Sequence, residues 1–363
     1  GIAALIYAAA RLSSGNRPLA ALVAIVWVVL SPGALTVINH HWFTTAASMA
    51  SAVCLLVMVN GSPRRVTAVG AGVFAGTAAM ITSTRGALMC VALLVVLLTL
   101  PTGRPRVMSA VAGMVAVPTA LALYVAAHGA FTAAVDDVIR YPLLHYAGIQ
   151  AVPFGSGTSM KHLALVALFP VTLILAAVAL ARGGVAEWRD PRFRVSLALA
   201  VVGLVGSYPR PDAVHIAFTV PLACPLFALV AATMPGPGRV AVALLTGLSL
   251  VGLGETVTSA IRVNGAPVVA TARGVVVPGH SIAASGFAEL LVRIDRAPSG
   301  SGFFFYPYSP LLPYLTGRRH TAAIDVMVPG YTSAEQLRRT CARVLAEAQW
   351  VVIDRQWSDP VLL

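Results

Sequence analysis

The chain has 363 residues, of which 58% are apolar and only 10% charged, and its mean hydropathy is +0.84. A soluble domain carries roughly a quarter charged residues, so this composition excludes an ordinary soluble enzyme, a disordered tail and a collagen-like fibre. The net charge is +12, but the basic residues lie between apolar blocks, which favours membrane-topology signals over nucleic-acid binding. The 4 cysteines form no Cys-x-x-Cys pair, so neither a zinc site nor a disulfide framework is expected.

Apolar blocks follow one another along the first 258 residues. A helix needs roughly 20 apolar residues to cross a hydrocarbon layer about 30 Å thick. We therefore expect residues 1–258 to form a mainly α, polytopic transmembrane helical bundle of about ten spans, at 1–10, 18–38, 43–59, 66–82, 86–100, 107–127, 162–181, 195–206, 213–234 and 240–258. The first block is too short to cross and does not resemble a signal peptide, so we expect an N-terminally truncated fragment that begins inside a span.

Basic residues in the loops between these blocks predict which loops share a side of the membrane, because cytoplasmic loops are the more basic ones. Alternate loops carry most of them, namely Arg11, Arg17, Arg64, Arg65, Arg104, Arg106, Arg182, Arg189, Arg192, Arg194 and Arg239. The intervening loops carry only Arg85, Arg140, Lys161 and Arg210. We therefore expect the intervening loops, and everything after about residue 258, to lie outside the cytoplasm.

Residues 259–363 have a different composition, with more charges and shorter apolar runs, and are expected to form a small extracytoplasmic α/β domain. Two apolar runs predict buried strands and two patterned segments predict helices, at Phe303–Tyr306 and Trp350–Asp354 for the strands and at Ala283–Arg296 and 333–349 for the helices. Ser333 and Gln336 have the spacing of a capping box at the start of the second helix. No glycine-rich phosphate-binding motif follows a predicted strand.

Several polar residues gather at the predicted outer ends of the spans. His40 and His41 are adjacent, which is a poor metal-ligand spacing because neighbouring side chains on a helix do not face one point. An interfacial turn and a role in phosphate binding or acid–base chemistry both remain open for them. Arg85 breaks the charge rule, and either captures a phosphate through its guanidinium or extends to the interface.

The long loop between the sixth and seventh blocks contains the carboxylate pair Asp136 and Asp137, followed by His145 and Lys161. Paired carboxylates can bind a divalent ion or share a proton, although exposed loop carboxylates usually do neither. The loop composition is also typical of a lid that contacts a sugar or an acceptor. Lys161 is a candidate phosphate-binding or sugar-binding residue.

The segment Tyr208–His215 places Asp212 where a helix N-cap is expected and His215 one turn later. One interpretation is purely structural, with Asp212 capping the helix. In the other, Arg210 and His215 hold an anionic head group near the helix N-terminus, where backbone amides favour anions. Asp136 and Asp212 are the weak candidates for a catalytic carboxylate.

Four groups of residues resemble the GT-C superfamily of membrane glycosyltransferases, and in particular the bacterial relatives of the dolichyl-phosphate-mannose–protein mannosyltransferases. The first three lie in the predicted bundle, at Leu30-Ser-Pro-Gly33 with Asn39-His-His-Trp42, at Arg85-Gly86, and at Pro209-Arg-Pro-Asp212-Ala-Val-His215. The fourth and most distinctive follows the bundle, at Phe305-Tyr-Pro-Tyr-Ser-Pro310, Tyr314-Leu-Thr-Gly-Arg318 and Pro329-Gly-Tyr331.

This resemblance implies an enzyme of the cell membrane that moves a sugar from a polyprenyl-phosphate donor to a glycan, lipid or protein acceptor outside the cytoplasm. It also implies an inverting displacement with a carboxylate base in the first external loop, which we expect to precede Gly1. Arg85, Arg210 and Lys161 would hold the phosphate, while His40, His41 and His215 would contact phosphate or sugar. No cofactor is certain, and a divalent metal is an open alternative.

Three other classes of protein remain open. A transporter would place charges near the membrane midplane on broken helices, but the blocks at 18–38 and 107–127 carry none. A non-catalytic membrane scaffold or partner subunit would need no reactive residues. A transferase resembling the O-antigen ligases would use external arginine and histidine without a carboxylate base.

Overall fold

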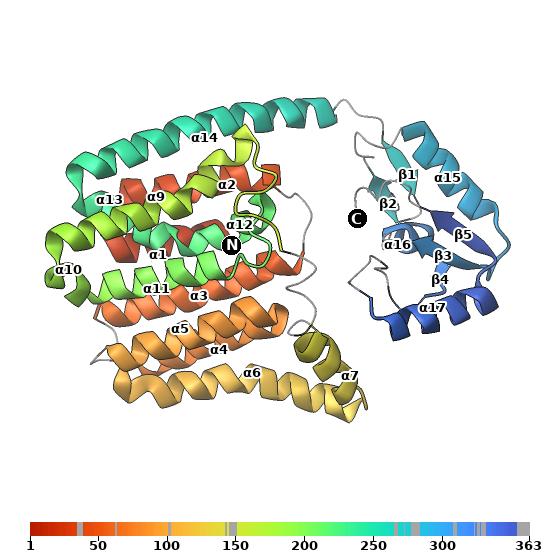
Figure 1. The fold of residues 1–363 in the computed structure, drawn as a ribbon, viewed down its shortest axis with the longest axis horizontal. Coiled ribbons are helices and arrows are strands. Elements are labelled where there is room, and N and C mark those ends of the chain that lie inside the picture. The colour runs from red at the N-terminus through yellow and green to blue at the C-terminus, as the bar shows by residue number, and fades with distance from the viewer. Residues whose placement is uncertain are drawn as a thin grey trace. The chain divides into compact units, whose positions relative to one another are not determined.

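The computed structural model describes residues 1–34, 39–61, 64–100, 103–141, 144, 151–264, 268–271, 273–276, 284–307, 311–322, 324, 327 and 332–353. The chain divides into two compact units, Gly1–Thr258 and Ser259–Leu363. The first is helical and the second combines helices with short strands (Figure 1).

The described helices of the first unit begin with α1 (Ile2–Ser14), α2 (Arg17–Ala34), α3 (His40–Val59), α4 (Arg65–Ile81), α5 (Ser83–Thr99), α6 (Val107–Ala127) and α7 (Phe131–Val135). They continue with α9 (Met160–Gly183), α10 (Val185–Arg189), α11 (Pro191–Val205), α12 (Ala213–Thr219), α13 (Cys224–Thr233) and α14 (Pro235–Asn264), of which α14 extends past the boundary at Thr258. Short turns at Arg104–Arg106, Asp136–Arg140 and Val220–Leu222 join some of them. The helices lie side by side, with α10 at one end of the bundle and α7 at the other (Figure 1).

Local sequence signals set several of these helix ends. The side chain of Asn39 accepts a hydrogen bond from the backbone N–H of His41 and so caps α3. Asp190 caps α11 and Asp212 caps α12 in the same way, which satisfies backbone donors that a helix start leaves unpaired. The N-cap predicted at Asp212 is therefore confirmed.

The interior of the bundle is mainly apolar, and several of its buried polar groups pair with one another or with the backbone. Phe169, Phe193 and Phe227 are fully buried. The indole Nε1 of Trp27 donates to the carbonyl oxygen of Ala217 at 3.0 Å, and the Oγ atoms of Ser13 and Ser196 lie 2.6 Å apart. Such pairing is needed where no water is present to satisfy a polar group.

Helices α4 and α6 pack closely because small residues face each other across their interface. A Cβ atom added at Gly72 would overlap the carbonyl oxygen of Ala110, and one added at Gly76 would overlap that of Met114. The spacing of these two glycines brings two helix backbones into direct contact, as is common between helices in membranes.

Four described helices are long and apolar enough to cross a membrane, at His40–Val59, Arg104–Ala127, His162–Gly183 and Pro235–Thr258. The pair formed by Ala213–Leu222 and Cys224–Thr233 is bent by 60° and would make a fifth. The chain is thus a helical membrane protein by length and composition, but about ten spans are not confirmed. Helices such as α5, with 17 residues, rise about 26 Å at 1.5 Å per residue and fall short of the span length.

The second unit contains two small sheets and three described helices. Strands β1 (Val269–Thr271) and β2 (Gly274–Val276) pair antiparallel, and β4 (Arg319–His320), β3 (Gly302–Tyr306) and β5 (Trp350–Ile353) form a parallel sheet in that order. The helices are α15 (Ala284–Arg296), α16 (Leu311–Thr316) and α17 (Ala334–Glu347). Phe303 and Phe305 of the central strand are buried against Ile294 of α15.

The predicted strands at 303–306 and 350–354 and the predicted helices at 283–296 and 333–349 match β3, β5, α15 and α17 to within one or two residues, although Asp354 lies outside the described residues. The capping box is confirmed: Ser333 Oγ accepts from the backbone N–H of Gln336 at 3.2 Å, and Gln336 Oε1 accepts from that of Ser333 at 2.9 Å.

Candidate functional site

A pocket of about 280 Å³ opens in the first unit, where three junctions between helices meet. These junctions are the start of α3, the break between α4 and α5, and the loop between α11 and α12. Five residues proposed from the sequence line the pocket together, namely His40, His41, Arg85, Arg210 and His215. They meet because His40, His41, Arg85 and His215 lie in the first turns of α3, α5 and α12, and Arg210 lies in the loop just before α12.

Arg85 is the most deeply held of these residues, with only 8% of its surface exposed. Its Nε donates to the carbonyl oxygen of Gly206 at 2.8 Å, and its guanidinium carbon lies 6.0 Å from the ring centroid of Phe218. An arginine guanidinium stays protonated inside proteins. Arg85 thus supplies a fixed positive charge at the pocket wall.

Three histidine rings that line the same pocket are in contact, with His41 between His40 and His215. The centroids of His40 and His41 are 4.0 Å apart, and those of His41 and His215 are 5.4 Å apart. The buried Nδ1 atom of His41 has no hydrogen-bond partner among the described residues. An unpartnered buried nitrogen is costly unless a ligand or water satisfies it, which is consistent with a binding site at this point.

Asp212 joins the loop to the helix through several hydrogen bonds. Its Oδ1 accepts from the backbone N–H of His215 at 2.9 Å and lies 2.8 Å from the ring Nδ1 of the same residue. Its Oδ2 accepts from Nε of Arg210 at 2.7 Å. Burial raises the pKa of the Asp212 carboxyl, but the hydrogen bonds from His215 and Arg210 outweigh it and lower the pKa from 3.8 to about 2. Asp212 is therefore ionised at neutral pH and is a poor proton acceptor.

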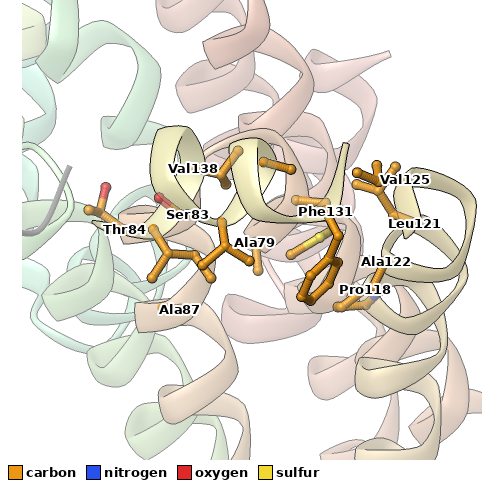
Figure 2. Close-up of a pocket in the computed structure, with 14 residues that line it drawn as sticks. Ala79, Ser83, Thr84, Ala87, Pro118, Leu121, Ala122, Val125, Phe131 and Val138 are labelled. Atoms are coloured by element: carbon orange, nitrogen blue, oxygen red, sulfur yellow. The ribbon is translucent and has the colours of Figure 1, made fainter. Parts of the chain in front are cut away.

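A second, larger pocket of about 530 Å³ adjoins the first and is lined mainly by apolar side chains of α4, α5, α6 and α7. Both pockets are lined by Met80, Ser83, Thr84 and Val138. Figure 2 shows the hydroxyl groups of Ser83 and Thr84 at one side of this cavity and Phe131 and Pro118 at the other. A cationic pocket and an apolar pocket therefore share one wall.

The remaining candidates lie elsewhere or outside the described part of the chain. Asp136 pairs with Arg140 at 3.6 Å, and both side chains are more than half exposed, so this carboxylate lines neither pocket. Lys161 belongs to α9, but its side chain is outside the described residues, as are the side chain of Asp137 and the whole of His145.

The sequence did not predict the apolar pocket. Its lining combines small residues of three helices, Ala79, Ala87 and Ala122, with Pro118 inside α6. Each of these is ordinary in an apolar helix, and only their common position at one wall makes a cavity. A proline inside a predicted span was the one available signal, because it interrupts the backbone hydrogen bonds of a helix.

Among the described residues, no group of three or more His, Cys, Asp or Glu side chains is arranged to hold a metal ion. Comparison with protein-family models, with curated proteins and with solved structures finds no match. The fold and the two pockets define a helical membrane protein whose candidate site combines a cationic pocket with an adjoining apolar pocket.

Proposed function

We propose that the protein is an integral membrane glycosyltransferase that moves a sugar from a polyprenyl-phosphate donor to an acceptor on the extracytoplasmic side of the cell membrane. The observation that carries the proposal is the shared wall between the cationic pocket and the apolar pocket. A polyprenyl-phosphate sugar is an amphiphile with the same two parts, a long apolar chain and an anionic head group.

The donor would lie across this wall with its prenyl chain among the apolar residues of α6 and α7 and its phosphate near Arg85 and Arg210. Guanidinium groups bind phosphate oxygens in pairs of hydrogen bonds. During transfer the phosphate leaves the sugar and gains negative charge, and fixed cations that stabilise this charge lower the barrier. His40 and His41 line the same pocket and would contact the phosphate or the sugar.

The distribution of arginines supports an extracytoplasmic position for the site. The pocket lies at the end of the bundle that carries the less basic loops, and the more basic loops are expected in the cytoplasm. The proposed site would therefore face outward, and the second unit would also lie outside the cytoplasm.

A pair of matched variants tests the proposal. Ala122 lines the apolar pocket, whereas Ala120 lies two residues earlier on the same helix, is exposed and does not line it. In protein reconstituted into vesicles, Ala122→Trp is expected to weaken binding of polyprenyl phosphate and transfer from polyprenyl-phosphate hexoses or pentoses by about tenfold or more, which is about 1.4 kcal/mol, while Ala120→Trp leaves both unchanged. Equal behaviour of the two variants would contradict the proposal.

A further inference from the structure

The ring of His215 is held by a carboxylate that is itself held by an arginine. Nδ1 of His215 lies 2.8 Å from Oδ1 of Asp212, and Oδ2 of Asp212 accepts from Nε of Arg210 at 2.7 Å. Because an ionised carboxylate only accepts hydrogen bonds, Nδ1 must carry the ring proton. The lone pair of the neutral ring is then on Nε2, and this side chain lines the cationic pocket.

The other groups that line this pocket are less suited to accept a proton. Arg85 and Arg210 are cations that stay protonated. Asp212 does not line the pocket, and both of its oxygens already accept hydrogen bonds. His40 and His41 also line the pocket, but only His215 is paired with a carboxylate among the described residues. A carboxylate in this position fixes the tautomer and stabilises the imidazolium that forms.

We propose that His215 is the base that deprotonates the acceptor, and that Asp212 is a positioning residue that acts through it; this rests on the proposed function. The acceptor oxygen forms a bond to the anomeric carbon of the sugar as the bond from that carbon to the phosphate oxygen breaks. The electron pair of the broken bond leaves with the polyprenyl phosphate. The hydroxyl proton moves to Nε2 of His215 and then passes to water.

The charges around His215 fit this role. On its own segment it faces Asp212 and Arg210; from α3 it faces His40 and His41; and from α5 it faces Arg85. The arginine guanidiniums would hold the phosphate, and Asp212 balances the positive charge that forms on the imidazole when it takes the proton. Proton transfer by a positioned side chain contributes about a hundredfold to ten-thousandfold in rate.

The test uses full-length chain in vesicles with polyprenyl-phosphate sugars as donors. His215→Gln is expected to lower the transfer rate by about a hundredfold or more while binding of polyprenyl phosphate changes less than about threefold. His128→Gln is the matched control, because His128 lies at the end of α6, bonded to the carbonyl oxygen of Tyr124, and lines neither pocket.

Asp212→Asn is expected to lower the rate by about tenfold or more. Its control is Asp190→Asn, because Asp190 also caps a helix and also pairs with an arginine two residues away.

The pH profile separates a base from a merely structural residue. An imidazole accepts a proton only when it is neutral, so transfer by the unmodified protein is expected to fall as the pH is lowered into the acid range, and the residual rate of His215→Gln is expected to lack this fall. Two results for His215→Gln would overturn the inference when the unmodified protein transfers sugar. One is that the variant transfers sugar equally well; the other is that it loses carrier binding to the same extent as transfer. If the unmodified protein neither binds the carrier nor transfers sugar from it, the proposed function fails instead.

Discussion

Nε of Arg85 donates a hydrogen bond to the carbonyl oxygen of Gly206, which lies 121 residues further along the chain, at 2.8 Å. This contact joins the start of α5 to the end of α11, where the carbonyl groups of a helix have no partner within the helix. It positions the rest of the guanidinium beside Phe218 and at the pocket wall. One side chain therefore connects the helix packing to the charge of the proposed phosphate site.

Replacement of Arg85 by Ala is expected to weaken binding of polyprenyl phosphate by about tenfold or more and to lower the free energy of unfolding by about 1–3 kcal/mol, because a buried, charge-assisted hydrogen bond is lost. Binding in vesicles and thermal unfolding in detergent measure the two effects. Arg104→Ala is the control, since Nε of Arg104 also donates to a backbone carbonyl oxygen, that of Leu98, but at an exposed position that lines neither pocket. Unchanged carrier binding in Arg85→Ala would contradict the assignment.

The ionised state of Asp212 predicts a pH dependence of stability. Its pKa is about 2 in the folded chain, against 3.8 for the free group. A pKa that is lowered on folding stabilises the fold above about pH 4, and this stabilisation is lost as the pH falls from 4 towards 2. The loss is expected to be about 2 kcal/mol. Thermal unfolding in detergent at a series of pH values measures it.

Asp212→Asn provides the comparison for this prediction, because the amide does not titrate and still caps a helix well. The stability difference between the two proteins is expected to be constant above about pH 4 and to shrink towards zero near pH 2. A difference that stays the same throughout this range would show that Asp212 does not account for the acid sensitivity.

The close packing of α4 against α6 predicts that substitutions at two glycines of α4 differ sharply in their effect on stability. Gly76→Leu is expected to force the two helices apart and to cost about 1–3 kcal/mol, because even a Cβ atom there meets the backbone of Met114. Gly70→Ala in the same helix meets only Sγ of Cys54 at 3.6 Å, an ordinary contact, and is expected to be neutral or slightly stabilising. Equal melting temperatures for the two variants would argue against this interface.

The capping box at the start of α17 is expected to contribute to the stability of the second unit. Ser333→Ala removes the side chain that accepts from the backbone N–H of Gln336 and is expected to cost about 1 kcal/mol. Ser333→Asp keeps an acceptor at the same position and is expected to retain most of the stability. Hydrogen exchange of the α17 amides in the full chain measures both, and equal exchange in the two variants would contradict the prediction.

The elements of the chain were largely predictable from local patterns. The block at 107–127 matches α6 in its bounds, and the block at 162–181 matches α9 to within two residues. The block at 213–234, expected as one span, is instead bent by 60° between α12 and α13. Pro221 and Pro225 stand at this bend and account for it, because proline removes a backbone donor from a helix. The count of about ten spans is not confirmed for a related reason, since apolar blocks do not reveal how long a continuous helix will be.

The sequence by itself determined the helical, membrane-embedded character of the first unit, the N-cap at Asp212 and the capping box at Ser333, because hydropathy and capping act between residues that are close in the chain. The tertiary structure decided that His41, Arg85 and His215 share one pocket, that Asp212 holds the ring of His215, and that an apolar cavity adjoins them. These features depend on side chains from helices far apart in the sequence, whose relative positions are set by packing.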